Sequence, residues 1–151
     1  MRESCGIFGA YAVDRLHQVS KYIYYGLYSL QHRGQESAGI ATSDGMHLRV
    51  YRGMGLVPEV FDSERLQKLF GFLGIGHIRY STTGISSIEN AQPHVVNSPK
   101  GEIAVAHNGN LINTTEIYRK LRKHGHIFIS STDSELIAHL LAREYLNTDD
   151  V

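Results

Sequence analysis

Five short polar clusters hold the side chains that could do chemistry in this 151-residue chain. The first is the single cysteine, Cys5, close to the N-terminus. A thiol there can be a small buried hydrophobe, or a nucleophile if a nearby group takes its proton. The other clusters are Arg33-Gly34, Arg79-Tyr80-Ser81-Thr82, His107-Asn108-Gly109-Asn110, and Asp133.

Each cluster also has an ordinary structural explanation. Cys5 alone could pack as an inert thiol, which is the commonest fate of a free cysteine. Arg33 could form an ion pair with Glu36, and Arg79 could be a surface charge after a buried strand. Taken one at a time, these residues do not decide between structure and catalysis.

The remaining clusters are equally ambiguous by themselves. Asn108-Gly109 could be only a tight turn, because this pair tolerates positive φ. Asp133 could only favour the N-terminus of a helix. His124 and His126 lack a third ligand, so we predict no metal site.

Composition limits the class of protein. Hydrophobic residues make up 42% and charged residues 20%, which is typical of a soluble globular domain. Fifteen Lys and Arg balance fifteen Asp and Glu, so no net field attracts nucleic acid. No apolar run reaches the ~20 residues of a membrane span. One cysteine excludes an internal disulfide, and we expect a cytoplasmic protein that binds neither nucleic acid nor membrane.

The clusters follow elements that the hydrophobic pattern predicts. Strands are expected where apolar residues alternate or run between turns, and helices where they recur every three or four residues. The expected strands are 5–12, 37–42, 46–52, 72–80, 102–107 and 127–129, and the expected helices are 14–30, 63–70, 113–123 and 132–145. Residues 53–58 and 81–99 are expected to be loops. Capping by Asp14, Gly34, Asn113 with Glu116, and Thr132 with Glu135 is also expected. The whole predicts one α/β or α+β domain with sites where strands end.

Five motifs in order resemble those of the class II glutamine amidotransferases, the N-terminal-nucleophile glutaminases. They are residues 5–9 (CGIFG), 30–40 (LQHRGQESAGI), 76–82 (GHIRYST), 107–111 (HNGNL) and 131–135 (STDSE). Residues 30–40 look most like amidophosphoribosyltransferases, which open purine synthesis. The resemblance implies an α+β fold, the four-layer αββα sandwich of N-terminal-nucleophile hydrolases, incomplete at its C-terminal end.

The resemblance also implies residue roles. Cys5 would attack the side-chain amide of glutamine, while Asn108 and Gly109 would donate to the oxyanion. Arg79 would bind the α-carboxylate of glutamine and Asp133 the α-ammonium group. The remaining substrate-site residues that it implies are Arg33, Gly34, Tyr80 and Thr82.

The same resemblance makes residues 1–4 a propeptide, because the family's active cysteine is the first residue of the mature chain. Residues 5–151 would be a C-terminally truncated amidotransferase domain. A phosphoribosyltransferase domain would be absent, together with its phosphoribosyl pyrophosphate and magnesium. No cofactor is expected in this chain itself, and the complete protein would be a homo-oligomer.

Two other functions stay open at this point. The chain could be a glutaminase that serves another acceptor, such as a sugar phosphate or 2-oxoglutarate. Alternatively, it could be a non-catalytic glutamine-binding module that keeps residues 1–4, because Cys5 has no free amine while Ser4 is attached.

Overall fold

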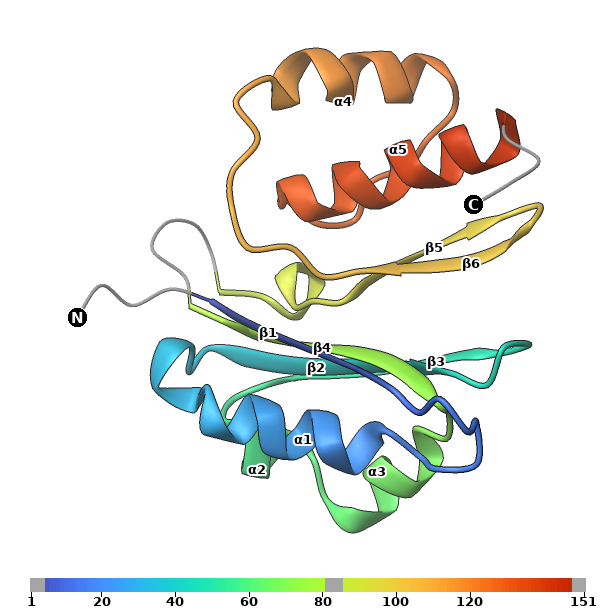
Figure 1. Cartoon of the computed structure of the whole chain (residues 1–151). Helices are drawn as coiled ribbons and strands as arrows, with labels where there is room; N and C mark the ends of the chain where they lie inside the picture. The colour runs from blue at the N-terminus through green and yellow to red at the C-terminus, as the bar shows by residue number, and fades with distance from the viewer. Residues whose placement is uncertain (1–4, 81–85, 148–151) are drawn as a thin grey trace.

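Four layers stack in the order helices, sheet, sheet, helices (Figure 1). The computed structural model describes residues 5–80 and 86–147. Within them, the first sheet has the strand order β1-β4-β2-β3 and the second sheet pairs β5 with β6, all antiparallel. This arrangement confirms the predicted α+β, four-layer αββα sandwich.

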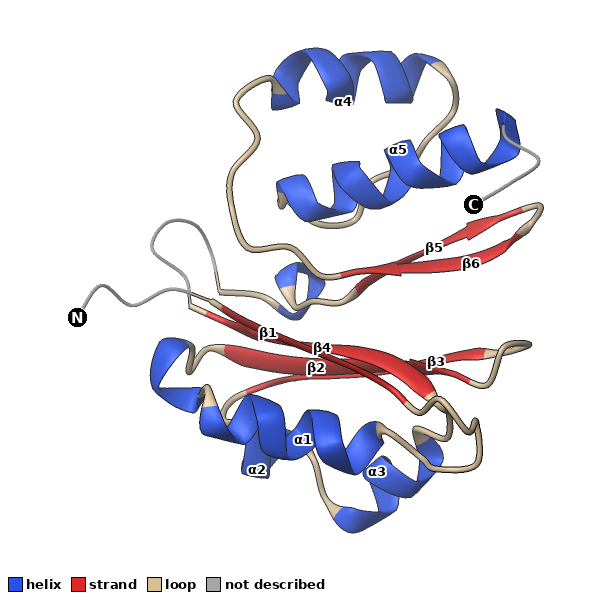
Figure 2. Cartoon of the chain, viewed as in Figure 1, coloured by secondary structure: helices blue, strands red, loops and turns tan. Residues whose placement is uncertain are grey.

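The α-helices cover the outer faces of the two sheets, which face each other in the middle, and the short 3₁₀ helix Ile88–Asn90 lies between the two layers (Figure 2). Helices α1, α2 and α3 lie below the first sheet, and α5 lies on the second sheet with α4 outside it. The strands are β1 (Gly6–Tyr11), β2 (Ser37–Ser43), β3 (Leu48–Met54), β4 (Leu73–Arg79), β5 (His94–Ser98) and β6 (Gly101–Val105). The helices are α1 (Ser20–Ser29), α2 (Val57–Val60), α3 (Ser63–Lys68), α4 (Thr114–Lys123) and α5 (Asp133–Asn147).

The main core lies between α1 and the first sheet. Ile23 and Leu27 on α1 are fully buried there. A Cβ placed on Gly76 would lie 2.5 Å from Ile23, so this glycine allows the helix to pack closely on β4. Since side chains alternate along a strand, His77 and Arg79 of β4 point to the opposite face, toward the second sheet.

A smaller core lies between the second sheet and α5. Val96 of β5 and Val105 of β6 pack against Ala138 and Ala142 of α5. This layer places the start of α5 and the loop after β6 beside the start of β1 and the C-terminal end of β4. The site described below is built from these four places and from the turn that carries Arg33.

Four predicted elements are wrong in detail. The first helix begins at Ser20 rather than near Asp14, whose carboxylate instead accepts the Leu16 N–H within a turn. The predicted loop 53–58 includes the start of α2. The predicted loop 81–99 contains β5, which pairs with β6. Residues 127–129 form no strand, and none of the strands in the described part of the chain pairs with them.

The predicted capping interactions are also wrong. Asn113 precedes α4 but makes no side-chain capping bond. Thr132 bonds His94 instead of capping α5, and Glu135 accepts the N–H groups of Ile129 and Ser130. Both side chains thus stabilise the loop before α5 rather than its first turn. Within the described residues, no helix is long and apolar enough to cross a membrane.

Candidate functional site

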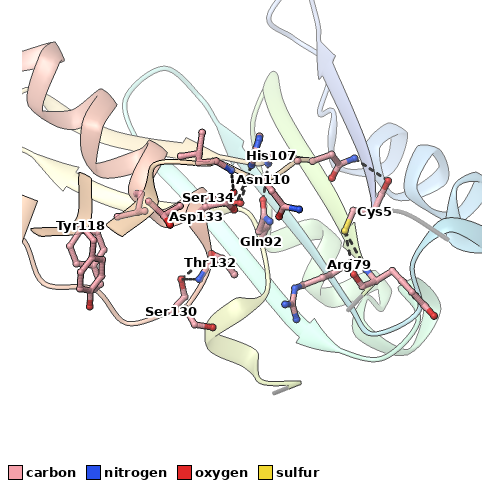
Figure 3. Close-up of a pocket in the computed structure, with 18 of the residues that line it drawn as sticks. Cys5, Arg79, Gln92, His107, Asn110, Tyr118, Ser130, Thr132, Asp133 and Ser134 are labelled. Atoms are coloured by element: carbon pink, nitrogen blue, oxygen red, sulfur yellow. Dashed lines mark hydrogen bonds and ion pairs between the residues drawn. The ribbon is translucent and has the colours of Figure 1, made fainter. Parts of the chain in front are cut away.

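A cavity of about 1080 Å³ opens where the two sheets and α5 meet. Seven of the nine predicted site residues line it: Cys5, Arg33, Arg79, Tyr80, Asn108, Gly109 and Asp133. Figure 3 shows Cys5 and Arg79 on one side and Asp133 on the other. The predicted residue Thr82 lies outside the described residues, as do the predicted propeptide residues 1–4.

Cys5 lies at the start of β1, next to the end of β4. Its Sγ is 3.4 Å from the backbone nitrogen of Tyr80 and 3.7 Å from the Tyr80 carbonyl oxygen. The side chain is half-buried and faces the cavity, so it is not packed away in a core.

The carbonyl oxygen of Cys5 is held by two side chains from distant parts of the chain. The Asn108 Nδ2 atom donates to it at 3.0 Å, and the Arg33 Nε atom donates at 3.2 Å. These bonds fix the backbone of the cysteine against the loop that follows β6. They place the Asn108 amide beside the thiol-bearing residue.

The Asn108 amide is held from its other end as well. Its Oδ1 atom lies 2.9 Å from Nε2 of His77, a residue that is only 1% exposed. Burial lowers the pKa of His77 to about 4, so the ring is neutral near pH 7. The sequence did not single out His77, because its position inside a strand gave it no distinctive signal.

Arg79 is buried rather than a surface charge. It forms an ion pair with Glu36, and the two side chains are 12% and 11% exposed. Glu36, which the sequence suggested as an ion-pair partner of Arg33, therefore pairs with Arg79 instead. A guanidinium has five N–H donors, so a carboxylate on one side leaves donors for a second anion in the cavity.

Gly34 allows the turn that carries Arg33 to lie against the end of β4. A Cβ there would be 2.8 Å from the carbonyl carbon of Arg79, which is a backbone atom. Its backbone is extended, and α1 ends at Ser29, so Gly34 is not the predicted cap of that helix. Its role is close packing rather than helix termination.

Asp133 is the first residue of α5 and ties down the loop after β6. Its Oδ2 atom accepts the N–H of Leu111 at 2.7 Å. Its Oδ1 atom is 3.9 Å from Nδ1 of His107. One carboxylate thus orients the loop that carries Asn108 and Gly109, and it also presents negative charge to the cavity.

Relatives of this chain include amidophosphoribosyltransferases. The enzyme of Methanocaldococcus jannaschii is 62% identical over 97% of this chain, that of Homo sapiens 50% over 94%, and that of Bacillus subtilis 46% over 95%. The chain spans about a third of the length of these relatives, namely 31%, 29% and 30%. Residues 77–148 match the family described as "Glutamine amidotransferase domain".

The chain belongs to the glutamine amidotransferases. Two solved structures agree with this assignment. The glutamine phosphoribosylpyrophosphate amidotransferase of B. subtilis aligns with a TM-score of 0.75 and 44% identity over 92% of this chain and 29% of its own. A structure titled as the allosteric regulatory enzyme of purine biosynthesis aligns at 0.81 and 45%, over 91% and 29%. Their glutaminase domains share the N-terminal-nucleophile hydrolase fold that the sequence predicted.

The amidotransferase domain therefore gathers its predicted site residues from five separate segments. What sequence reasoning missed is the supporting set behind them: Glu36 behind Arg79, and His77 behind Asn108. Both are polar residues in otherwise buried positions, which is the only signal that the sequence carried for them. Within the described residues, no group of three His, Cys, Asp or Glu side chains could hold a metal ion.

Proposed function

We propose that this domain hydrolyses glutamine through a thioester on Cys5 and supplies the released ammonia to an acceptor. The observation that carries the proposal is the contact of the Asn108 amide with the backbone of Cys5, at 3.0 Å. It places a side-chain N–H donor beside a cavity-facing thiol, which is the arrangement that acyl transfer requires.

Substrate orientation follows from the charges around the cavity. Arg79 binds the α-carboxylate of glutamine with donors that Glu36 leaves free, and Asp133 binds the α-ammonium group. The side-chain amide then lies toward Cys5. Glutamate is rejected because it brings a charged oxygen to the thiol, and asparagine because its amide is one methylene short.

The chemistry begins with removal of residues 1–4, which gives Cys5 a free α-amine. An α-amine has a pKa of about 8, so a substantial fraction is neutral near pH 7 and accepts the thiol proton. Sulfur bonds to the amide carbon, and the carbonyl electrons move to oxygen. The Asn108 side-chain N–H and the Gly109 backbone N–H stabilise that oxyanion, each contributing about 3 kcal/mol.

Collapse of this intermediate breaks the carbon–nitrogen bond. The ammonium group of Cys5 returns its proton to the leaving nitrogen, which departs as ammonia. The neutral amine then takes a proton from water, whose oxygen attacks the thioester. The carbon–sulfur bond breaks, the ammonium group of Cys5 returns its proton to sulfur, and glutamate is released.

The acceptor is phosphoribosyl pyrophosphate, converted to phosphoribosylamine in purine biosynthesis. This step is proposed for the intact protein, since the relatives at 46–62% identity carry the name amidophosphoribosyltransferase and are about three times as long. Assembly as a homo-oligomer belongs to the same proposal. A sugar phosphate or 2-oxoglutarate as acceptor is the competing possibility, and it predicts that phosphoribosyl pyrophosphate does not stimulate glutamine consumption.

The test compares Cys5→Ala with the unchanged protein for ammonia and glutamate release. Loss of both products in the variant, with glutamine still bound, supports nucleophilic catalysis by Cys5. Undiminished glutamate release by Cys5→Ala would reject it. Glutamine binding without any turnover in the unchanged protein would favour a binding module that keeps residues 1–4.

A further inference from the structure

His77 lies in the middle of the molecule rather than on the wall of the cavity. It sits on β4, a central strand of the first sheet, opposite Ile7 of β1 and Gly39 of β2. Its side chain faces the second sheet and is only 1% exposed. Its Nε2 atom forms a hydrogen bond with Oδ1 of Asn108, which lines the cavity.

The contacts of Asn108 fix which way its amide points. Its nitrogen donates to the Cys5 carbonyl oxygen at 3.0 Å. The opposite orientation would place two oxygens, both acceptors, at that distance. Oδ1 therefore faces His77, and because an amide oxygen only accepts, Nε2 of His77 must carry the hydrogen.

Burial here is costly for a histidine. Its other ring nitrogen, Nδ1, is buried with no hydrogen-bond partner among the described residues. An apolar side chain would fill the same space without leaving a polar atom unsatisfied. The hydrogen bond between the ring and Asn108 is therefore the part that needs explaining.

We propose that His77 is the positioning residue that holds the Asn108 amide with its N–H groups toward the oxyanion. This inference rests on the proposed glutaminase function. The amide nitrogen carries two hydrogens. One is used by the Cys5 carbonyl, and the other is left for the oxyanion in the cavity. Without a donor at Oδ1, the amide can rotate and present its oxygen, which repels an oxyanion.

The positioning role makes no use of proton transfer by His77. Desolvation, together with the charges of His94 and Arg79, keeps the pKa of the ring at about 4. The activity between pH 6 and 9 therefore contains no titration of His77. A general acid or base at this position would instead change the pH profile when replaced.

The experiment uses the intact protein and two variants with the same amide group. In His77→Gln, the amide nitrogen can reach roughly the place of Nε2, whereas in His77→Asn it is one methylene shorter and falls near Nδ1. We expect His77→Asn to lower kcat by about 10- to 100-fold, less than the full loss of an oxyanion donor. KM for glutamine should change less than threefold, because Arg79 and Asp133 are untouched. His77→Gln should recover kcat to within about fivefold, with an unchanged pH profile.

Two patterns of kcat among the variants would overturn the inference. One is a kcat of His77→Asn within twofold of the unchanged protein. The other is equal impairment of His77→Gln and His77→Asn while both unfold at the same urea concentration, which would make His77 purely structural. An altered pH profile in His77→Gln would also reject the positioning role, because it would indicate proton transfer.

A spectroscopic measurement separates this inference from the proposed function. If the unchanged protein releases no ammonia, the proposed function fails, but the Asn108 side-chain amide still reports on His77. In a protein labelled with ¹⁵N at asparagine, hydrogen-bonded Asn108 side-chain amide protons that exchange slowly with solvent are expected in the unchanged protein and in His77→Gln. Faster solvent exchange and a changed chemical shift of these protons in His77→Asn alone support the inference. Identical spectra in all three proteins would overturn it.

Discussion

At the scale of single residues, Asn108 carries the clearest energetic prediction. Its Nδ2 donates to the Cys5 backbone, and its second N–H is free to stabilise an oxyanion. Asn108→Asp keeps the shape but removes both donors and adds negative charge. We expect kcat to fall by at least 10²- to 10³-fold with glutamine binding retained, measured by steady-state glutaminase assays. A rise in KM for glutamine as large as the fall in kcat would instead indicate that Asn108 binds the substrate.

Arg79 gives a complementary prediction about binding. Its planar guanidinium serves Glu36 and, in our proposal, the α-carboxylate of glutamine. Arg79→Lys keeps the charge but cannot serve both anions with the same geometry. KM for glutamine should rise at least tenfold while kcat changes less. A normal KM in Arg79→Lys would remove Arg79 from the substrate site.

Sequence patterns supplied the residues that face the cavity but not those behind them. Cys5, Asn108 and Asp133 stand in short polar motifs at element ends, so their types and positions were informative. Glu36 and His77 act through contacts 43 and 31 residues away in sequence, with Arg79 and Asn108. No local pattern encodes such pairings, because they exist only once the strands lie side by side.

At the scale of elements, Gly39 of β2 lies directly against the backbone of the segment that precedes β5. A Cβ there would lie 2.0 Å from the Gln92 carbonyl oxygen, a backbone atom that cannot swing away. Gly39→Ala should therefore lower the free energy of unfolding by more than about 2 kcal/mol, measured by urea denaturation. Gly9→Ala is the control, since its nearest neighbours would be at ordinary contact distances of 3.8 and 3.9 Å. Equal stability of both variants would contradict this packing.

Strands and helices were predicted correctly from the sequence where the apolar pattern extends over many residues. The prediction failed where tertiary contacts determine whether a segment forms a strand. The strand β4, with its run of apolar residues, was predicted nearly to its bounds. The strand β5 was missed because Pro93 and Pro99 flank it and made the segment resemble a loop. Residues 127–129 have strand-like side chains but no neighbouring strand, so propensity alone misled there.

At the scale of the whole molecule, the layer between the sheets should control acid stability. Burial lowers the pKa of both His77 and His94 to about 4, from an ordinary value of 6.5. Each unfolded histidine takes up a proton as pH falls below about 6.5, while the folded one does not until about 4. Stability is therefore full above pH 6.5 and is lost as pH falls, on the order of 3 kcal/mol for each histidine by pH 4.

Urea denaturation between pH 7 and 5 measures this loss in a window where few carboxylates titrate. His94→Gln should show a shallower pH dependence than the unchanged protein, because one of the two buried histidines is gone. The groups that act on His94 include Glu135, Arg52, Arg79 and His139. His126 and His139 also have lowered pKa values, and they titrate in both proteins, so the difference between the two curves reports His94 together with its coupling to neighbouring histidines. Parallel pH curves would contradict the neutral burial of His94.

The central claim is that Cys5, once freed of residues 1–4, forms a glutamyl thioester. Mass spectrometry of the intact protein, quenched in acid during turnover of glutamine, tests it most directly. The account predicts a chain that begins at Cys5, with a fraction heavier by one glutamyl group that is absent from Cys5→Ala. The account would be contradicted by a protein that releases ammonia while its chain still begins at Met1. It would also be contradicted by turnover that leaves no adduct on Cys5 at any quenching time.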